Sequence, residues 1–318
     1  LDPLRQLAWA VLGVVVLHFG LVAALPGEGE HEHEDDETAR VPGIDLAECA
    51  NEGILFPGGC GHGSVLLHAE FLVDLVLALF PFEVPFFEKY GLKAVFVGHP
   101  VVERAARMTG GAALRVRLGI AANAPLLALL PGSRTSEIRF ILPAFRAAVD
   151  ILARKIPGLV TVLPTVPHVA GKVRAATAGW ATPLHIVESE ADKYAAFDAA
   201  DTALAASGTV TAELALSRTP MVVAYKVGGL TYFLSRWMMT VKHFTLINIL
   251  LEREAVPEYL QAAATPETLT DAVVRLFADP AARASQVAAM NEFAHRLGEG
   301  DEPPSTRAAR VLLDFVES

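Results

Sequence analysis

The chain has 318 residues, a formal net charge of −10 at pH 7 and a hydrophobic content of 53%. The length suggests two domains of ordinary size with ample core, and the acidic balance argues against nucleic acid as the main partner. Two cysteines, Cys49 and Cys60, are too few for a disulfide framework and fit a reducing, cytosolic setting. The positive mean hydropathy, +0.39, points to contact with membrane or lipid.

The segment 1–71 differs from the rest of the chain. Leu7 to Leu25 carries no formal charge and is long enough to span a bilayer, with an acidic run following at 28–37. The positive-inside rule would place everything downstream outside the cell, as would a signal peptide, and both conflict with the cytosolic chemistry argued below. Three interpretations stay open: a membrane anchor, a buried apolar segment, or sequence foreign to the fold, such as a misread frame. The third is favoured. His31 and His33 lie among carboxylates, but a solvated acidic loop is the preferred interpretation and no metal site is predicted.

From Leu72 the pattern becomes regular. An apolar strand is predicted at 73–80, a helix from Pro81 to Tyr90, and a second strand at 94–97. His99 follows that strand, at the end where parallel sheets bind ligands, so it is a candidate substrate-facing residue. A turn histidine with a satisfied hydrogen bond is the equal alternative. Residues 104–118 are predicted to form an exposed helical linker.

The second half alternates strands with helices. Strands are predicted near 126, 159, 184, 202 and 221, and helices at 135–155, 169–178, 191–197 and 210–217. The fully apolar run Leu126 to Leu130 is typical of a buried parallel strand. This alternation predicts a Rossmann-like, doubly wound α/β domain. Three terminal helices, at 266–277, 280–297 and 304–316, each have proline near their start and are interpreted as packing elements.

Two strand-to-helix turns carry the chemistry. One is Gly132-Ser133-Arg134 and the other is Ser207-Gly208-Thr209. Free N–H groups and the dipole at a helix start favour an anion, and Arg134 adds a planar charged fork that suits phosphate oxygens. Gly208 lets a ligand approach the backbone, and Glu213, one turn past Thr209, could accept hydrogen bonds from two sugar hydroxyls. We therefore predict that both turns converge on the diphosphate of a ribonucleotide.

Two later stretches leave alternatives open. Residues 230–239, LTYFLSRWMM, form either an amphipathic surface that touches acyl chains or a bilayer, or an ordinary core helix. Asn248 is a polar residue in an apolar stretch, so it needs partners if buried. Its amide could bind a uracil or sugar edge, or cap a helix.

Several strings together resemble the lipid-A-disaccharide synthase family of GT-B glycosyltransferases. They are LALFPFE at 77–83, FVGHP at 96–100, LALLPGSR at 127–134, AASGTVTAEL at 205–214 and PMVVAYK at 220–226. Asn248, with its downstream Leu-Leu, and Gln261 complete the match, which covers the chain from about Leu72 to the C-terminus.

The resemblance implies a GT-B-like α/β fold with a C-terminal Rossmann-like domain and a truncated or aberrant N-terminal one. In this scheme 1–71 is atypical, 72–118 is a remnant of the acceptor domain, 119–298 binds the UDP-sugar donor and 299–318 is a C-terminal helix. Eight residues would hold UDP: Gly132, Ser133, Arg134, Ser207, Gly208, Thr209, Glu213 and Asn248. His99, Tyr225 and Gln261 would face the substrate.

The implied reaction is an inverting transfer of 2,3-diacylglucosamine from its UDP derivative to 2,3-diacylglucosamine 1-phosphate, without a cofactor. The implied location is cytoplasmic and peripheral to the inner membrane. However, the family's Gly-Glu-x-Ser-Gly-Asp turn, its aspartate-bearing strand end and its Ser-Pro-Ser-x-Trp-Ala-Trp stretch are not recognisable in 1–71. No catalytic base is therefore assigned, and we expect weak UDP binding with little or no transfer. The alternatives are a non-catalytic UDP-binding remnant and another GT-B enzyme that uses UDP-GlcNAc, such as a cell-wall glucosaminyltransferase or an epimerase.

Overall fold

The computed structural model describes residues 74–226 and 242–317. The predictions made for the apolar stretch 7–25, for His31 and His33, and for 230–239 lie outside the described residues. Within those two ranges, no helix combines the length and the apolar character that crossing a bilayer requires.

The larger unit is built on a six-stranded parallel sheet. In chain order its strands are β3 (Leu126–Leu130), β4 (Val160–Pro164), β5 (Leu184–Val187), β6 (Thr202–Ala206), β7 (Met221–Tyr225) and β8 (Glu258–Leu260). In space the order is β5-β4-β3-β6-β7-β8, and every pairing is parallel. The chain first forms β3 inside the sheet and adds β4 and β5 on one side of it. It then adds β6, β7 and β8 on the other side of β3. The predicted doubly wound sheet is confirmed, and its switch point lies between β3 and β6.

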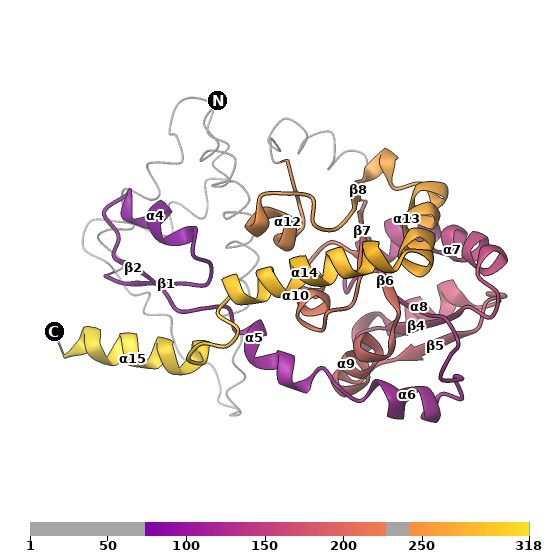
Figure 1. The fold of residues 1–318 in the computed structure, drawn as a ribbon, viewed down its shortest axis with the longest axis horizontal. Coiled ribbons are helices and arrows are strands. Elements are labelled where there is room, and N and C mark those ends of the chain that lie inside the picture. The colour runs from indigo at the N-terminus through magenta and orange to yellow at the C-terminus, as the bar shows by residue number, and fades with distance from the viewer. Residues whose placement is uncertain (1–73, 227–241, 318) are drawn as a thin grey trace, which may run out of the picture.

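Helices cover both faces of this sheet because alternate side chains of each strand point to opposite sides. Leu126, Ala128 and Leu130 enter one core, while Leu127 and Leu129 enter the other. The first core is closed by α9 (Glu190–Ala199), α10 (Thr209–Leu216), α12 (Leu246–Leu251) and α14 (Pro280–Arg296). The second is closed by α7 (Thr135–Lys155), α8 (Pro167–Thr177) and α13 (Pro266–Ala278) (Figure 1).

The predicted exposed helical linker over 104–118 is helical for most of its length, but it is not one continuous helix. The chain forms α5 (Val101–Arg104), a 3-10 turn (Ala105–Arg107) and α6 (Gly111–Arg117). The break comes at Gly110, whose φ of 101° leaves the right-handed helical region. Gly111 is buried because α6 packs against α9 so closely that a Cβ there would lie 2.5 Å from the Ala199 nitrogen.

A smaller unit precedes α5. It consists of β1 (Val76–Ala78), α4 (Glu83–Glu88) and β2 (Ala94–Phe96), with the two strands parallel. The C-terminal helix α15 (Pro304–Val316) returns to this unit (Figure 1). The contact includes Lys93 Nζ, just before β2, which lies 5.2 Å from the centre of the Phe315 ring of α15. The chain therefore ends against the unit with which its described part begins.

Candidate functional site

The two predicted turns leave neighbouring strands at the same edge of the sheet. β3 and β6 pair directly, with Leu130 opposite Ala205, and the strands are parallel. The turn from Gly132 and the turn from Ser207 therefore start side by side at the switch point, which is where open α/β sheets bind ligands.

The turn after β3 already holds a carboxylate. Oε2 of Glu137 accepts hydrogen bonds from the backbone N–H groups of Ser133, at 2.8 Å, and Arg134, at 3.1 Å. Its Oε1 lies 3.3 Å from Arg134 Nη1, while the Arg134 side chain stays 59% exposed. Gly132 has a φ of 107°, and a Cβ there would lie 2.1 Å from Glu137 Oε2. Two backbone N–H groups of this turn therefore point to one carboxylate oxygen of the same chain, Glu137 Oε2.

Basic side chains of α8 adjoin this turn. His168 Nε2 lies 2.8 Å from the Ser133 carbonyl oxygen, and because a carbonyl accepts, this nitrogen carries the proton. Lys172 Nζ donates to Thr135 Oγ1 at 2.8 Å. Sequence reasoning missed both residues, since no motif surrounds them and their partners lie more than 30 positions away. Glu137 was also missed as a ligand of the turn, although its place three residues after Arg134 is typical of a capping residue.

The turn after β6 is open. Gly208 and Thr209 are exposed, and a Cβ on Gly208 would meet no atom of the described residues within 4 Å. Gly208 has an extended φ of 163°, which any residue can adopt, so its own conformation does not require glycine. The Ser207 hydroxyl donates to the Phe244 carbonyl at 3.2 Å, which ties the turn to the segment 243–245.

Glu258 holds that segment in place. Its carboxylate binds His243 Nδ1 at 2.8 Å and accepts from the N–H groups of Phe244, at 3.2 Å, and Thr245, at 2.9 Å. Among the residues that the structure describes, His243 Nε2 and Thr245 Oγ1 are buried without a hydrogen-bond partner. This polar cluster beside Ser207 was not predicted from the sequence.

Glu213 lies beneath the second turn and is engaged by other side chains. Its side chain is 8% exposed, and Lys193 Nζ of α9 lies 3.0 and 2.9 Å from its two oxygens. Tyr194 donates its hydroxyl to Oε1 at 3.3 Å, and Arg104 Nη1 of α5 lies 3.7 Å away. Burial, followed by the charge of Glu213, raises the pKa of the Tyr194 phenol, so it stays protonated as a donor.

Tyr225 and Gln261 also lie at the carboxyl edge of the sheet, at the ends of β7 and β8, where Tyr225 is opposite Leu260. Burial raises the pKa of Tyr225, the charge of Glu137 raises it further and that of Arg134 lowers it, which indicates that the phenol lies near the first turn.

Two other predicted residues have structural partners. Asn248 is fully buried, and its side chain accepts from the N–H groups of Ala255 and Val256 and donates to the Val256 carbonyl. His99 belongs to the smaller unit, where its Nδ1 accepts from the Val101 N–H at 3.1 Å.

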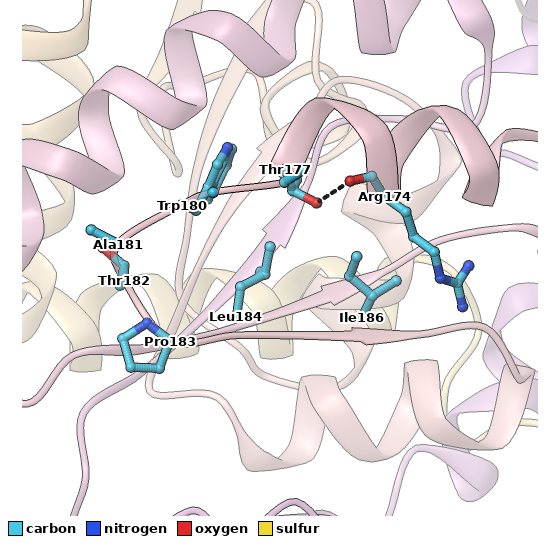
Figure 2. A pocket seen from close by; sticks show the side chains of 10 residues that line it. Arg174, Thr177, Trp180, Ala181, Thr182, Pro183, Leu184 and Ile186 are labelled. Atoms are coloured by element: carbon cyan, nitrogen blue, oxygen red, sulfur yellow. Dashed lines mark hydrogen bonds between the residues drawn. The ribbon is translucent and has the colours of Figure 1, made fainter.

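Two concave surfaces lie along α8. One, of about 380 Å³, is formed by α8, the loop with Trp180, and the edge strand β5 (Figure 2). The other, of about 390 Å³, runs between α7 and α8 from Thr135 to Trp180. Neither is lined by the predicted donor-site residues, so the candidate site is an open edge rather than one of these hollows.

The family model described as lipid-A-disaccharide synthetase matches residues 67–310. The chain belongs to the lipid-A-disaccharide synthetase family. Among its relatives is the lipid-A-disaccharide synthase of Rhodospirillum centenum, 48% identical over 248 residues, covering 78% of this chain and 62% of the relative. That of Paramagnetospirillum magneticum is 46% identical, with 77% and 63% covered. The chain thus spans less than two thirds of the length of these relatives.

Solved structures share the family's fold at low identity. A putative UDP-N-acetylglucosamine 2-epimerase from Listeria monocytogenes has a TM-score of 0.54 at 15% identity, with 78% of this chain and 62% of that chain covered. Another UDP-N-acetylglucosamine 2-epimerase has a TM-score of 0.53 at 14% identity, with 77% and 58% covered. The GT-B-like α/β fold predicted from the sequence is confirmed.

Proposed function

We propose that this chain carries the donor half of a lipid-A-disaccharide synthase and binds the UDP part of UDP-2,3-diacylglucosamine. The observation that carries the proposal is the pair of adjoining turns, one of which already coordinates the Glu137 carboxylate through two backbone N–H groups. We interpret the Glu137 carboxylate as a stand-in for a phosphate oxygen, because N–H groups at the start of a helix stabilise an anionic oxygen. A UDP co-structure of S. aureus MnaA, whose fold is similar at a TM-score of 0.51 and 14% identity, lends the proposal further support.

The chemistry of the site suits a departing nucleoside diphosphate. Negative charge grows on UDP as the bond to the sugar breaks, and Arg134, with the N–H groups that Glu137 now occupies, would stabilise it once UDP replaces that carboxylate. Lys172 adds positive charge beside the same turn, and His168 holds the Ser133 carbonyl in place. Glu213 would accept hydrogen bonds from the ribose, and Tyr225 and Gln261 would face the sugar from the neighbouring strands.

In the whole reaction, the acceptor would be 2,3-diacylglucosamine 1-phosphate, and its 6-hydroxyl must lose a proton. Inversion requires the general base on the face opposite UDP, hence on the acceptor side of the cleft. Because both substrates are acylated, we place the protein in the cytoplasm, peripheral to the inner membrane.

We expect Arg134→Ala to weaken UDP binding by about 1–3 kcal/mol, the range for losing a charge-assisted hydrogen bond. Calorimetric titration with UDP measures this. Arg154→Ala, an exposed arginine at the far end of α7, is the matched control and should bind UDP like the unmodified chain. Unchanged affinity in Arg134→Ala would remove this residue from the site.

We further expect this polypeptide to bind UDP yet show little or no sugar transfer, because the acceptor-side motifs of the family are not recognisable in 1–71. The assay is release of UDP from UDP-2,3-diacylglucosamine in the presence of the acylated acceptor. Turnover at an enzyme-like rate would refute the expectation and favour a complete enzyme over a UDP-binding remnant.

A further inference from the structure

We propose that Lys193 is a positioning residue that gives the donor site its preference for a ribonucleotide. It does so by holding both carboxylate oxygens of Glu213 in one orientation, toward the ribose hydroxyls. The inference rests on the proposed function and names a residue that no motif of the chain indicates.

The contact comes from two helices that start at the same edge of the sheet. Lys193 lies in the first turn of α9, which follows β5, and Glu213 lies in α10, which follows β6. The ammonium is within 3.0 Å of both carboxylate oxygens and lies 4.4 Å from the centre of the Tyr194 ring. Both Glu213 oxygens are therefore held in one orientation by a single cation.

The exposed fractions of the side chains indicate that the Lys193–Glu213 pair does more than contribute to packing. The Glu213 side chain is 8% exposed, whereas those of Lys193 and Arg104 are 27% and 49% exposed. Burying a carboxylate is unfavourable unless it is paired with a counter-ion. The two cations are thus the more exposed members of this cluster.

The hydrogen-bond inventory leaves room for a ligand. A carboxylate offers about four acceptor positions, and the ammonium and the Tyr194 phenol use three of them. One hydroxyl can therefore bind directly. A second can replace the Tyr194 hydrogen bond, which is the longest of the three at 3.3 Å.

The test is calorimetric titration with UDP and with 2′-deoxy-UDP, which lacks one of the two hydroxyls. The unmodified chain should prefer UDP roughly tenfold, the value of one hydrogen bond to a charged group. Lys193→Met should reduce that preference to about twofold or less, while Lys193→Arg, which keeps the charge, should retain most of it. Lys155→Met, which removes a lysine paired with Asp271 at 2.9 Å on the surface, is the control and should leave the ratio unchanged.

The ratio separates positioning from folding, since a purely structural lysine would lower both affinities equally. If Lys193→Met does not fold, Lys193→Gln takes its place, and the same reduction in preference is expected. Glutamine is shorter and uncharged but keeps an N–H donor. If Glu213→Gln abolishes the preference but the lysine variants keep it, the role of Lys193 is refuted and the donor site stands. If the unmodified chain binds neither nucleotide, the proposed function itself fails and the inference falls with it.

Discussion

Glu213→Ala is expected to weaken UDP binding about 100-fold, the largest loss of affinity for any single side chain of the site. Two hydrogen bonds from ribose hydroxyls to a buried, charged acceptor are lost together, which corresponds to about 3 kcal/mol. The substitution also leaves Lys193 and Arg104 without their shared partner. Calorimetry with UDP measures the affinity, and thermal unfolding of the same samples shows whether the variant is folded.

The control for Glu213→Ala is Glu299→Ala. Glu299 also forms an ion pair, with Arg218, which follows α10 at the end remote from the turn. Loss of that pair should leave UDP affinity unchanged. If Glu213→Ala binds UDP within about threefold of the unmodified chain, less than the loss expected for one hydrogen bond, this acid does not hold the ribose. The nucleotide proposal would then lose the residue that separates UDP from a simple phosphate.

The elements that were predicted correctly are those with a clear local sequence pattern. β6 and β7 begin at Thr202 and Met221, near the predicted positions, because their side chains are buried on both faces and the runs are continuously apolar. β8 was missed because three residues, Glu258 to Leu260, form no period; this strand exists through its pairing with β7. The helical character of the linker was predicted, but its break was not, because helical composition on both sides of Gly110 gives no sign of a glycine at positive φ.

The same distinction applies to the candidate site. We could predict that the turns at Gly132 and Ser207 are adjacent, because the alternation of strands and helices predicts the sheet and its carboxyl edge. The partners of those turns could not be predicted in this way. Lys193 meets Glu213 across 20 positions, and Lys172 meets Thr135 across 37, because helices on the same face of the sheet pack together. Asn248 was expected to need partners if buried, and the structure supplies them from a backbone turn seven and eight residues later.

Gly132→Ala is expected to destabilise the protein by about 3–4 kcal/mol and to weaken UDP binding at least tenfold. A positive φ alone is unfavourable for alanine by about 1–2 kcal/mol. At Gly132 the new Cβ would also lie 2.1 Å from Glu137 Oε2 and 2.7 Å from Glu137 Cβ. Glu137 would have to leave the turn, and the N–H groups of Ser133 and Arg134 would lose their acceptor.

Gly158→Ala separates the two contributions. Gly158 has a φ of 75° in the turn after α7, and a Cβ there would meet nothing within 4 Å. Gly158→Ala should therefore be destabilised only by the positive φ, about 1–2 kcal/mol in chemical denaturation, and should bind UDP normally. Equal destabilisation of the two variants would mean that Glu137 moves aside without penalty. In that case, the N–H groups of Ser133 and Arg134 would not need the present shape of the turn. The interpretation of the Glu137 carboxylate as a stand-in for a phosphate oxygen would then be wrong.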